Sequence, residues 1–400
     1  MLSPTYLSGV ADEVIDVYSQ VEQDIADDIV RRTLKMGYVT DTARWQYRKA
    51  QEFGYFQDDV AGILSRAGAR SRRQIKLIMS QAATDSLAFD DAIYKHVGLS
   101  PLPVAKSPAL QALLLQGTDR TMRLISNFTK TTSTMSYEVF GSILDRAYLQ
   151  ILSGAFSPQT AIYNAIRELS EKGITRIAYE SAAGRVSYDN IDVAVRRAVI
   201  TGVNQSVSKL QLARAEEMGC ELVEVTSHSG ARPSHAEWQG QVYALGNSGR
   251  HDYPDFEDST GYGTGEGLCG WNCYHNFYPY FDGLSTRSFS HDPSADAGRD
   301  NDADYELSQK QRYYERQVRA AKREASTWNA AVESARTEAE KAMYYDDFQW
   351  ASVKLKRREA ALQDFLNENG RTRDWYRLQT AGWNRSVSAK AVWANRKATK

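Results

Sequence analysis

Apolar residues recur every three or four positions through most of the first 200 residues, which is the period of an α-helix that buries one face. The first such segment carries Val10, Val14, Val17, Val21 and Ile25. Seven acidic residues and no basic one fall between Asp12 and Asp28. We interpret this run as the solvated face of a packing helix, with a docking surface for a basic partner as the alternative. Further helices are predicted near 41–53, 71–84, 108–130, 136–153 and 158–171.

The spacing of the apolar residues changes after Ile174. Two short alternating runs flank Ala183-Gly184 and predict a β-hairpin. A long helix is predicted from Asp189 to Met218, with Gly219 as a left-handed cap. Glu221–Thr226 alternates in the manner of a strand. The helix has an apolar stripe, and a second face carries Arg197, Thr201, Asn204 and Ser208.

Residues 227–285, called here the glycine-rich module, hold ten glycines between Gly230 and Gly283. The chain then has neither glycine nor proline from 299 to 369. Apolar residues from Tyr314 to Ala339 are spaced alternately four and three apart, the pattern of a coiled-coil seam. One continuous helix and a helical hairpin broken near 344–347 both fit this pattern. A complementary stripe is formed by Phe348, Ala351, Leu355, Leu362 and Phe365.

These patterns predict a predominantly α-helical, α+β protein. We expect three regions along the chain. Residues 1–134 would form a helical N-terminal region, 135–285 a central module with small β elements, and 286–400 a region of long charged helices with a basic tail.

The amino-acid composition argues against several classes of function. The chain has 49 Lys and Arg against 50 Asp and Glu, which argues against a generally basic nucleic-acid coat. Three cysteines make no disulfide framework and fit a reducing cytoplasm. Neither a signal peptide nor an apolar run of membrane-spanning length is visible. We therefore expect a soluble intracellular product with no membrane contact.

The densest group of reactive side chains lies in the glycine-rich module. A candidate ligand pool for Zn²⁺ consists of His228, His235, Cys269, Cys273 and His275. The C-x₃-C-x-H spacing is not that of a standard zinc finger, so the sequence favours a hydrogen-bonded structural network and no cofactor. Zinc is one alternative, and a catalytic Cys–His pair at Cys273 is another. We expect Trp238, Trp271 and Phe277 to be buried as the core of this module.

Eight basic residues and only one acidic residue occur among the last thirty, interleaved with tryptophans. A solvated helix surface, a protein-docking surface and a DNA contact are all compatible with this pattern. Candidates for docking or DNA contact are Arg371, Arg373, Arg377, Arg385, Trp375 and Trp383.

Three segments of the glycine-rich module, 227–243, 267–275 and 277–283, resemble the phage minor capsid protein 2 family, which is related to the MuF-like head-morphogenesis proteins of tailed bacteriophages. The resemblance covers roughly 135–370. Tyr274 stands where the family usually has a basic residue, which weakens the argument for an anion site at this point. The family motif maps onto His228, Arg232, His235, Gln239, Gly240, Gly267, Gly270, Asn272, Cys273 and His275.

The resemblance implies a structural minor capsid protein of the phage head at the portal vertex. Its partners would be the portal protein and the major capsid protein, it would act in head assembly or in DNA packaging and ejection, and it would have no small-molecule substrate and no enzymatic activity. Two alternatives remain. One is an intracellular enzyme that uses Cys273 with the motif histidines, and the other is a packaging or ejection factor whose basic tail contacts packaged DNA.

Overall fold

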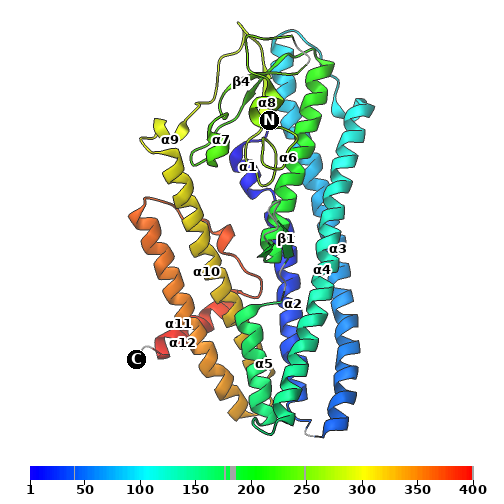
Figure 1. Cartoon of the computed structure of the whole chain (residues 1–400), viewed down its shortest axis with the longest axis vertical. Coiled ribbons are helices and arrows are strands. Elements are labelled where there is room, and N and C mark those ends of the chain that lie inside the picture. The colour runs from blue at the N-terminus through cyan, green and yellow to red at the C-terminus, as the bar shows by residue number, and fades with distance from the viewer. Residues whose placement is uncertain (40, 175–176, 181–185, 247–248, 399–400) are drawn as a thin grey trace. The chain divides into compact units, whose positions relative to one another are not determined.

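The computed structural model describes residues 1–39, 41–174, 177–180, 186–246 and 249–398. Most of the described chain is helical, with small antiparallel sheets, which confirms the predicted fold class (Figure 1). The helices are α1 (Pro4–Gly9), α2 (Asp12–Met36), α3 (Thr42–His96), η1 (Val104–Lys106), α4 (Pro108–Leu152), α5 (Pro158–Lys172), α6 (Ile191–Glu217), α7 (Pro233–Ala236), α8 (Phe256–Thr260), α9 (Pro293–Asp296), α10 (Asn301–Ser334), α11 (Glu338–Glu368), η2 (Tyr376–Leu378) and α12 (Arg385–Ala398). The strands are β1 (Ile177–Glu180), β2 (Val186–Asp189), β3 (Leu222–Val225), β4 (Val242–Ala244) and β5 (Phe277–Tyr280).

The chain forms two compact units, and each unit draws on three separate stretches. The first unit contains 1–15, 71–126 and 193–309, and the second contains 16–70, 127–192 and 310–400. The division into 1–134, 135–285 and 286–400 stays a prediction about domains, although its first boundary falls inside α4. Among the described residues, no helix carries an apolar stretch long enough to cross a membrane.

Two helices are longer than the apolar pattern predicted. The segments expected at 41–53 and 71–84 belong to the single helix α3, and those at 108–130 and 136–153 both belong to α4. In α4 the intervening run is rich in threonine, a residue with low helix propensity. The hydroxyl of Thr132 donates to the carbonyl of Phe128 at 2.8 Å, and that of Thr131 donates to the carbonyl of Asn127 at 3.0 Å. These hydroxyls bond to helix carbonyls four residues earlier, so the threonine side chains are satisfied without leaving the helix.

The acidic segment at the start of the second unit is helical, as predicted, but its acidic face is only partly solvated. In α2 the apolar residues Val14, Val17, Val21 and Ile25 are buried. Glu22 and Asp28 are buried as well, and Asp28 pairs with Arg32 at 2.8 Å. The prediction of a solvated acidic face was therefore wrong for these two residues.

A three-stranded antiparallel sheet lies in the first unit in the order β4-β3-β5. In the middle strand, Val223 pairs with Tyr243 of β4 and Pro279 of β5. All four residues of β3 are buried, so the strand does not alternate between core and solvent as the sequence suggested. Both faces are covered, because Val223 packs among Phe256 and Phe277 while Leu222 packs with Val242 and Ala244 of β4.

The predicted helix and hairpin around this region are present. The helix α6 ends before Gly219, which has φ of +63° and so occupies the left-handed position that glycine tolerates best. In the second unit β1 pairs with β2 in antiparallel register, Ile177 facing Asp189. The expected turn at Ala183-Gly184 lies outside the described residues.

The C-terminal apolar stripes belong to two helices, α10 and α11, with a break at 335–337 instead of 344–347. The hydroxyl of Thr337 accepts from the N–H of Glu340 and caps α11. The ring of Tyr314 on α10 lies 5.1 Å from that of Phe365 on α11, and Lys354 pairs with Glu324 at 2.6 Å. The buried seam contains Val318, Ala321, Ala325 and Trp328 on α10 and Phe348, Ala351, Leu355, Leu362 and Phe365 on α11. Ala339 lies beyond the end of α10 and is exposed.

Candidate functional site: a buried histidine–cysteine cluster

Three of the predicted site residues converge in the first unit. His235 lies on the short helix α7, which begins at Pro233, and Cys273 and His275 lie in the loop before β5. One ring nitrogen of each histidine and the Cys273 sulfur lie within 4.8 Å of one another, and all three side chains are buried. Because 38 residues separate His235 from Cys273, the cluster joins two distant parts of the glycine-rich module.

Hydrogen bonds orient both imidazole rings. The Nε2 atom of His235 lies 2.7 Å from the carbonyl oxygen of Glu266. The Nε2 atom of His275 lies 2.9 Å from Oε1 of Gln239, an oxygen that also accepts the backbone N–H of His228 at 3.1 Å. Both acceptors are oxygens, so each histidine carries its proton on Nε2. Both Nδ1 atoms then present a lone pair toward Cys273.

Cys273 lies between these two lone pairs. Its sulfur is 3.8 Å from Nδ1 of His235 and 3.6 Å from Nδ1 of His275. The backbone N–H of His275 also donates to the same sulfur at 3.4 Å. His228 contributes a ring stacked on His275, with 4.4 Å between the ring centroids.

The polar face of α6 that carries Thr201 and Asn204 bonds to the loop that contains Cys273. The side-chain amide of Asn204 donates to the carbonyls of Cys273 at 3.1 Å and His275 at 2.8 Å. The hydroxyl of Thr201, one turn earlier, accepts the backbone N–H of Asn272 at 2.9 Å. The sequence located this face by its spacing but assigned it no role. Its role is to bind backbone groups of an irregular loop.

The motif glycines allow close approaches between backbone segments. A Cβ atom at Gly240 would lie 2.1 Å from the carbonyl oxygen of Ser290, and Gly240 also has φ of +62°. A Cβ atom at Gly267 would lie 2.0 Å from the carbonyl oxygen of Gly261, and one at Gly270 would lie 2.4 Å from that of Gly265. Side chains at these three positions would force the loops around the cluster apart.

The remaining motif residues lie around the cluster. Arg232 donates to the carbonyl of Trp271 at 3.3 Å, and Cys269 and Asn272 adopt the left-handed conformation with φ of +59° and +53°. Cys269 is buried in the apolar core beside Cys273. Within the described residues, the group of mutually close ligand atoms includes neither Cys269 nor His228.

One expected core residue is on the surface. Trp238 and Phe277 are buried, but 59% of the Trp271 side chain is exposed. The prediction that Trp271 is buried was therefore wrong. The backbone turn that brings Cys273 inward directs the indole outward over Gly265, where an added Cβ would lie 2.6 Å from the ring.

Burial keeps the side chains of the cluster neutral. Desolvation raises the pKa of the Cys273 thiol to about 11 and that of the Cys269 thiol well above its ordinary value. It also lowers the pKa of His235 to about 4 and that of His275 well below its ordinary value. A nucleophilic cysteine needs a lowered pKa and access to substrate, so this environment does not favour a catalytic Cys–His pair.

The predicted tail residues belong to the second unit, not to the cluster. Arg371 donates to Gln311 at 2.7 Å, and Arg377 pairs with Asp374 at 3.1 Å. Arg373 donates to Gln363 at 2.9 Å, and its guanidinium lies 4.9 Å from the ring centre of Trp375. Arg385 opens α12 and is exposed, Trp375 is exposed, and Trp383 is half-buried.

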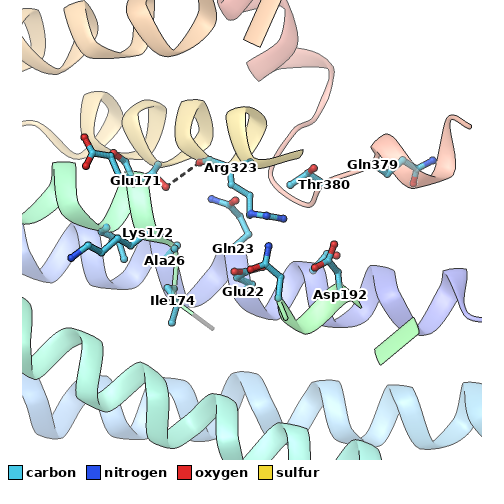
Figure 2. A pocket seen from close by; sticks show the side chains of 17 residues that line it. Glu22, Gln23, Ala26, Glu171, Lys172, Ile174, Asp192, Arg323, Gln379 and Thr380 are labelled. Carbon is cyan, nitrogen blue, oxygen red and sulfur yellow. Dashed lines mark hydrogen bonds between the residues drawn. The ribbon is translucent and has the colours of Figure 1, made fainter. Parts of the chain in front are cut away.

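The second unit also has a polar cavity of about 150 Å³. Figure 2 shows side chains of α2, α5 and α10 around it, among them Gln23, Lys172 and Arg323. Thr380, from the segment after η2, lines it too. Pockets for small organic ligands usually measure about 300–1,000 Å³, so the cavity is small for such a ligand.

Comparisons with known proteins cover most of the chain. The family model described as phage minor capsid protein 2 matches residues 2–367. A structural protein of Lactococcus phage LL-H is 26% identical over 280 residues, which cover 64% of this chain and 73% of that relative. A structural protein of Lactococcus phage mv4 is 45% identical over 67 residues, which cover 17% of this chain and half of that relative. No solved structure matches significantly.

Proposed function

The chain belongs to the phage minor capsid protein 2 family, and from this premise we propose that it is a non-enzymatic structural protein of a tailed phage head, docked at the portal vertex. The observation that carries the proposal is the extent of the family match, from residue 2 to 367, which includes parts of both compact units. Its partners would be the portal protein and the major capsid protein, and its location the virion. It would act in head assembly or in DNA packaging and ejection.

The geometry of the family motif supports a structural role. The motif histidines and glycines hold loops of the first unit together, and Cys273 is 2% exposed with a raised pKa. A substrate would have no access to this sulfur without opening the module. The enzyme alternative therefore has weaker support than the structural one.

The second unit offers side chains suited to docking. Trp350, Trp375, Tyr376 and Trp393 are each more than half exposed, although they are large and apolar. Tryptophan, tyrosine and arginine are the residues that most often carry the binding energy of protein interfaces. We call these four residues the exposed aromatic set and assign them to contact with another head protein.

The same region gives less support to DNA contact as its main role. Arg371, Arg373 and Arg377 already bond to side chains of the second unit. Arginines held in this way have fewer donors left for phosphate groups. The genome-contact alternative rests on the exposed basic residues of α12, such as Arg385 and Arg396.

The test is incorporation of full-length protein into phage heads. Phage carrying Trp375→Ala and Trp393→Ala together should contain at least about tenfold less of the protein per purified head, measured by quantitative mass spectrometry against the major capsid protein. The control is Tyr47→Ala, which removes an aromatic side chain that is 74% exposed on α3.

Normal incorporation of the double variant would contradict docking by the exposed aromatic set. Absence of the wild-type protein from purified heads would overturn the proposed function itself. Salt-sensitive DNA binding by the purified protein, lost on Arg385→Ala and Arg396→Ala, would favour the genome-contact alternative.

A further inference from the structure

At the centre of the histidine–cysteine cluster, two ring nitrogens that can only accept hydrogen bonds face a single thiol. The Nε2 protons of His235 and His275 are committed to the oxygens of Glu266 and Gln239. Both Nδ1 atoms are therefore acceptors, and each faces the Cys273 sulfur, whose thiol carries one hydrogen. A thiol donates one hydrogen bond, so it satisfies one of the two nitrogens. A cation at the centre would satisfy both nitrogens and the sulfur together.

The two sulfur–nitrogen distances agree with those around a tetrahedral zinc ion. With Zn–S of about 2.3 Å and Zn–N of about 2.0–2.1 Å, a sulfur and a nitrogen bound to the same ion lie about 3.6 Å apart. The Cys273 sulfur lies 3.6 Å and 3.8 Å from the two Nδ1 atoms. These two sulfur–nitrogen distances therefore suit a metal ion shared by the three side chains.

The surroundings also match those of a metal site. A metal-bound histidine usually donates its other ring N–H to a carbonyl or carboxylate, which fixes the tautomer and the ring plane. Both histidines here do so, one to a backbone carbonyl and one to the Gln239 amide oxygen. The backbone N–H of His275 donates to the Cys273 sulfur at 3.4 Å, a contact that favours the thiolate.

We propose that Nδ1 of His235, Sγ of Cys273 and Nδ1 of His275 bind one Zn²⁺ ion that fastens α7 to the loop before β5. On binding, the Cys273 sulfur forms the Zn–S bond and its proton is released to solvent. Mixed nitrogen and sulfur donors favour zinc over magnesium or calcium, which prefer oxygen ligands. Three protein ligands leave one position for a non-protein donor.

This proposal reverses what the sequence favoured, a hydrogen-bonded network without a cofactor. The irregular spacing of the ligands had argued against zinc, because standard fingers place their ligands on one hairpin and one helix. Here α7 and the turn with left-handed Cys269 and Asn272 bring the ligands together instead. The proposal is independent of the proposed function, since a metal can stabilise a protein in any location.

The test is metal content of the full-length protein, produced without an affinity tag and reconstituted with Zn²⁺ before gel filtration. Elemental analysis should give about one zinc per chain for the wild type, and at least about tenfold less for Cys273→Ser and His275→Gln. Cys220→Ser is the matched control, because Cys220 is also a buried thiol of the first unit and should retain the metal.

A cobalt spectrum keeps the test decisive if the variants fold poorly. Wild-type protein loaded with Co²⁺ should show sulfur-to-cobalt charge-transfer absorption, and Cys220→Ser should show it unchanged. Folded wild-type protein that binds far less than one zinc per chain would overturn the proposal. Retention of the metal by both Cys273→Ser and His275→Gln would overturn it as well.

Discussion

Around the glycine-rich module, buried polar side chains bond mainly to backbone groups, whereas in the second unit a buried arginine is surrounded by carboxylates. In the first unit, Glu224 is fully buried and accepts the backbone N–H groups of Ser288 and Phe289, each at 2.8 Å. In the second unit, Arg32 on α2 pairs with Asp28 at 2.8 Å and with Glu52 of α3 at 2.9 Å.

The difference follows from the backbone. Inside a long helix the N–H and C=O groups bond to one another, so a buried charged side chain such as Arg32 is neutralised mainly by carboxylates of other side chains. In an irregular loop many backbone groups have no such partner, and burial requires that a side chain supply one. The glycine-rich module therefore needs amides and carboxylates at fixed positions, and the helical unit needs matched charges.

The largest effect should come from breaking the charge cluster of the second unit. Arg32→Ala would leave the carboxylates of Asp28 and Glu52 buried without this partner, so we expect a loss of about 3–5 kcal/mol in the free energy of unfolding. Chemical denaturation measures it. Arg31→Ala is the control, because Arg31 also pairs with Asp28 but its side chain is 57% exposed, and it should cost less than about 1 kcal/mol. Equal losses would contradict the comparison.

A smaller loss is expected from the first unit. Asn204→Ala removes two hydrogen bonds to the carbonyls of Cys273 and His275, and we expect the free energy of unfolding to fall by about 2 kcal/mol. Lys209→Ala, an exposed substitution on the same helix, should change it by less than about 0.5 kcal/mol. A loss for Asn204→Ala no larger than that of the control would show that the loop holds its shape without α6.

Periodicity predicted the elements of both units better than their ends. The helix and strand types were readable because the apolar residues follow the periods 3.6 and 2. The break between α10 and α11 was misplaced although a signal was present. Thr337 and Glu340 form a capping box pattern, and the Glu340 carboxylate accepts the backbone N–H of Arg336 at 3.0 Å.

The candidate site was only partly readable, for a different reason. The motif identified which histidines and cysteines matter, but not that His235, Cys273 and His275 meet while Cys269 and His228 stand apart from the group. That outcome depends on two residues in the left-handed conformation, Cys269 and Asn272, neither of which is glycine. The same turn exposes Trp271. A left-handed non-glycine residue leaves no reliable signature in a single sequence.

The smallest effect is expected from Asp27, a partly buried acidic residue of the second unit. Burial, together with the nearby charges of Asp24 and Glu333, raises the pKa of Asp27 from 3.8 to about 6, against the opposing hydrogen bond from Gln23 and the charge of Arg31. The folded state thus holds this proton more tightly than the unfolded state, and stability falls as the pH rises from about 4 to about 6. A shift of this size would correspond to about 3 kcal/mol for a fully desolvated carboxyl group, and the partial exposure of Asp27 reduces it through solvent screening. Because Asp27→Asn cannot ionise, it should raise the free energy of unfolding by about 1 kcal/mol at pH 7.5 and change it little at pH 4. Asp58→Asn, an exposed substitution on α3, is the control and should change the free energy of unfolding by less than about 0.5 kcal/mol. Denaturation curves of the wild type and the two variants at both pH values give the changes in the free energy of unfolding. A gain from Asp27→Asn that is the same at pH 4 and pH 7.5 would contradict the prediction, because such a gain could not come from ionisation of the carboxyl group.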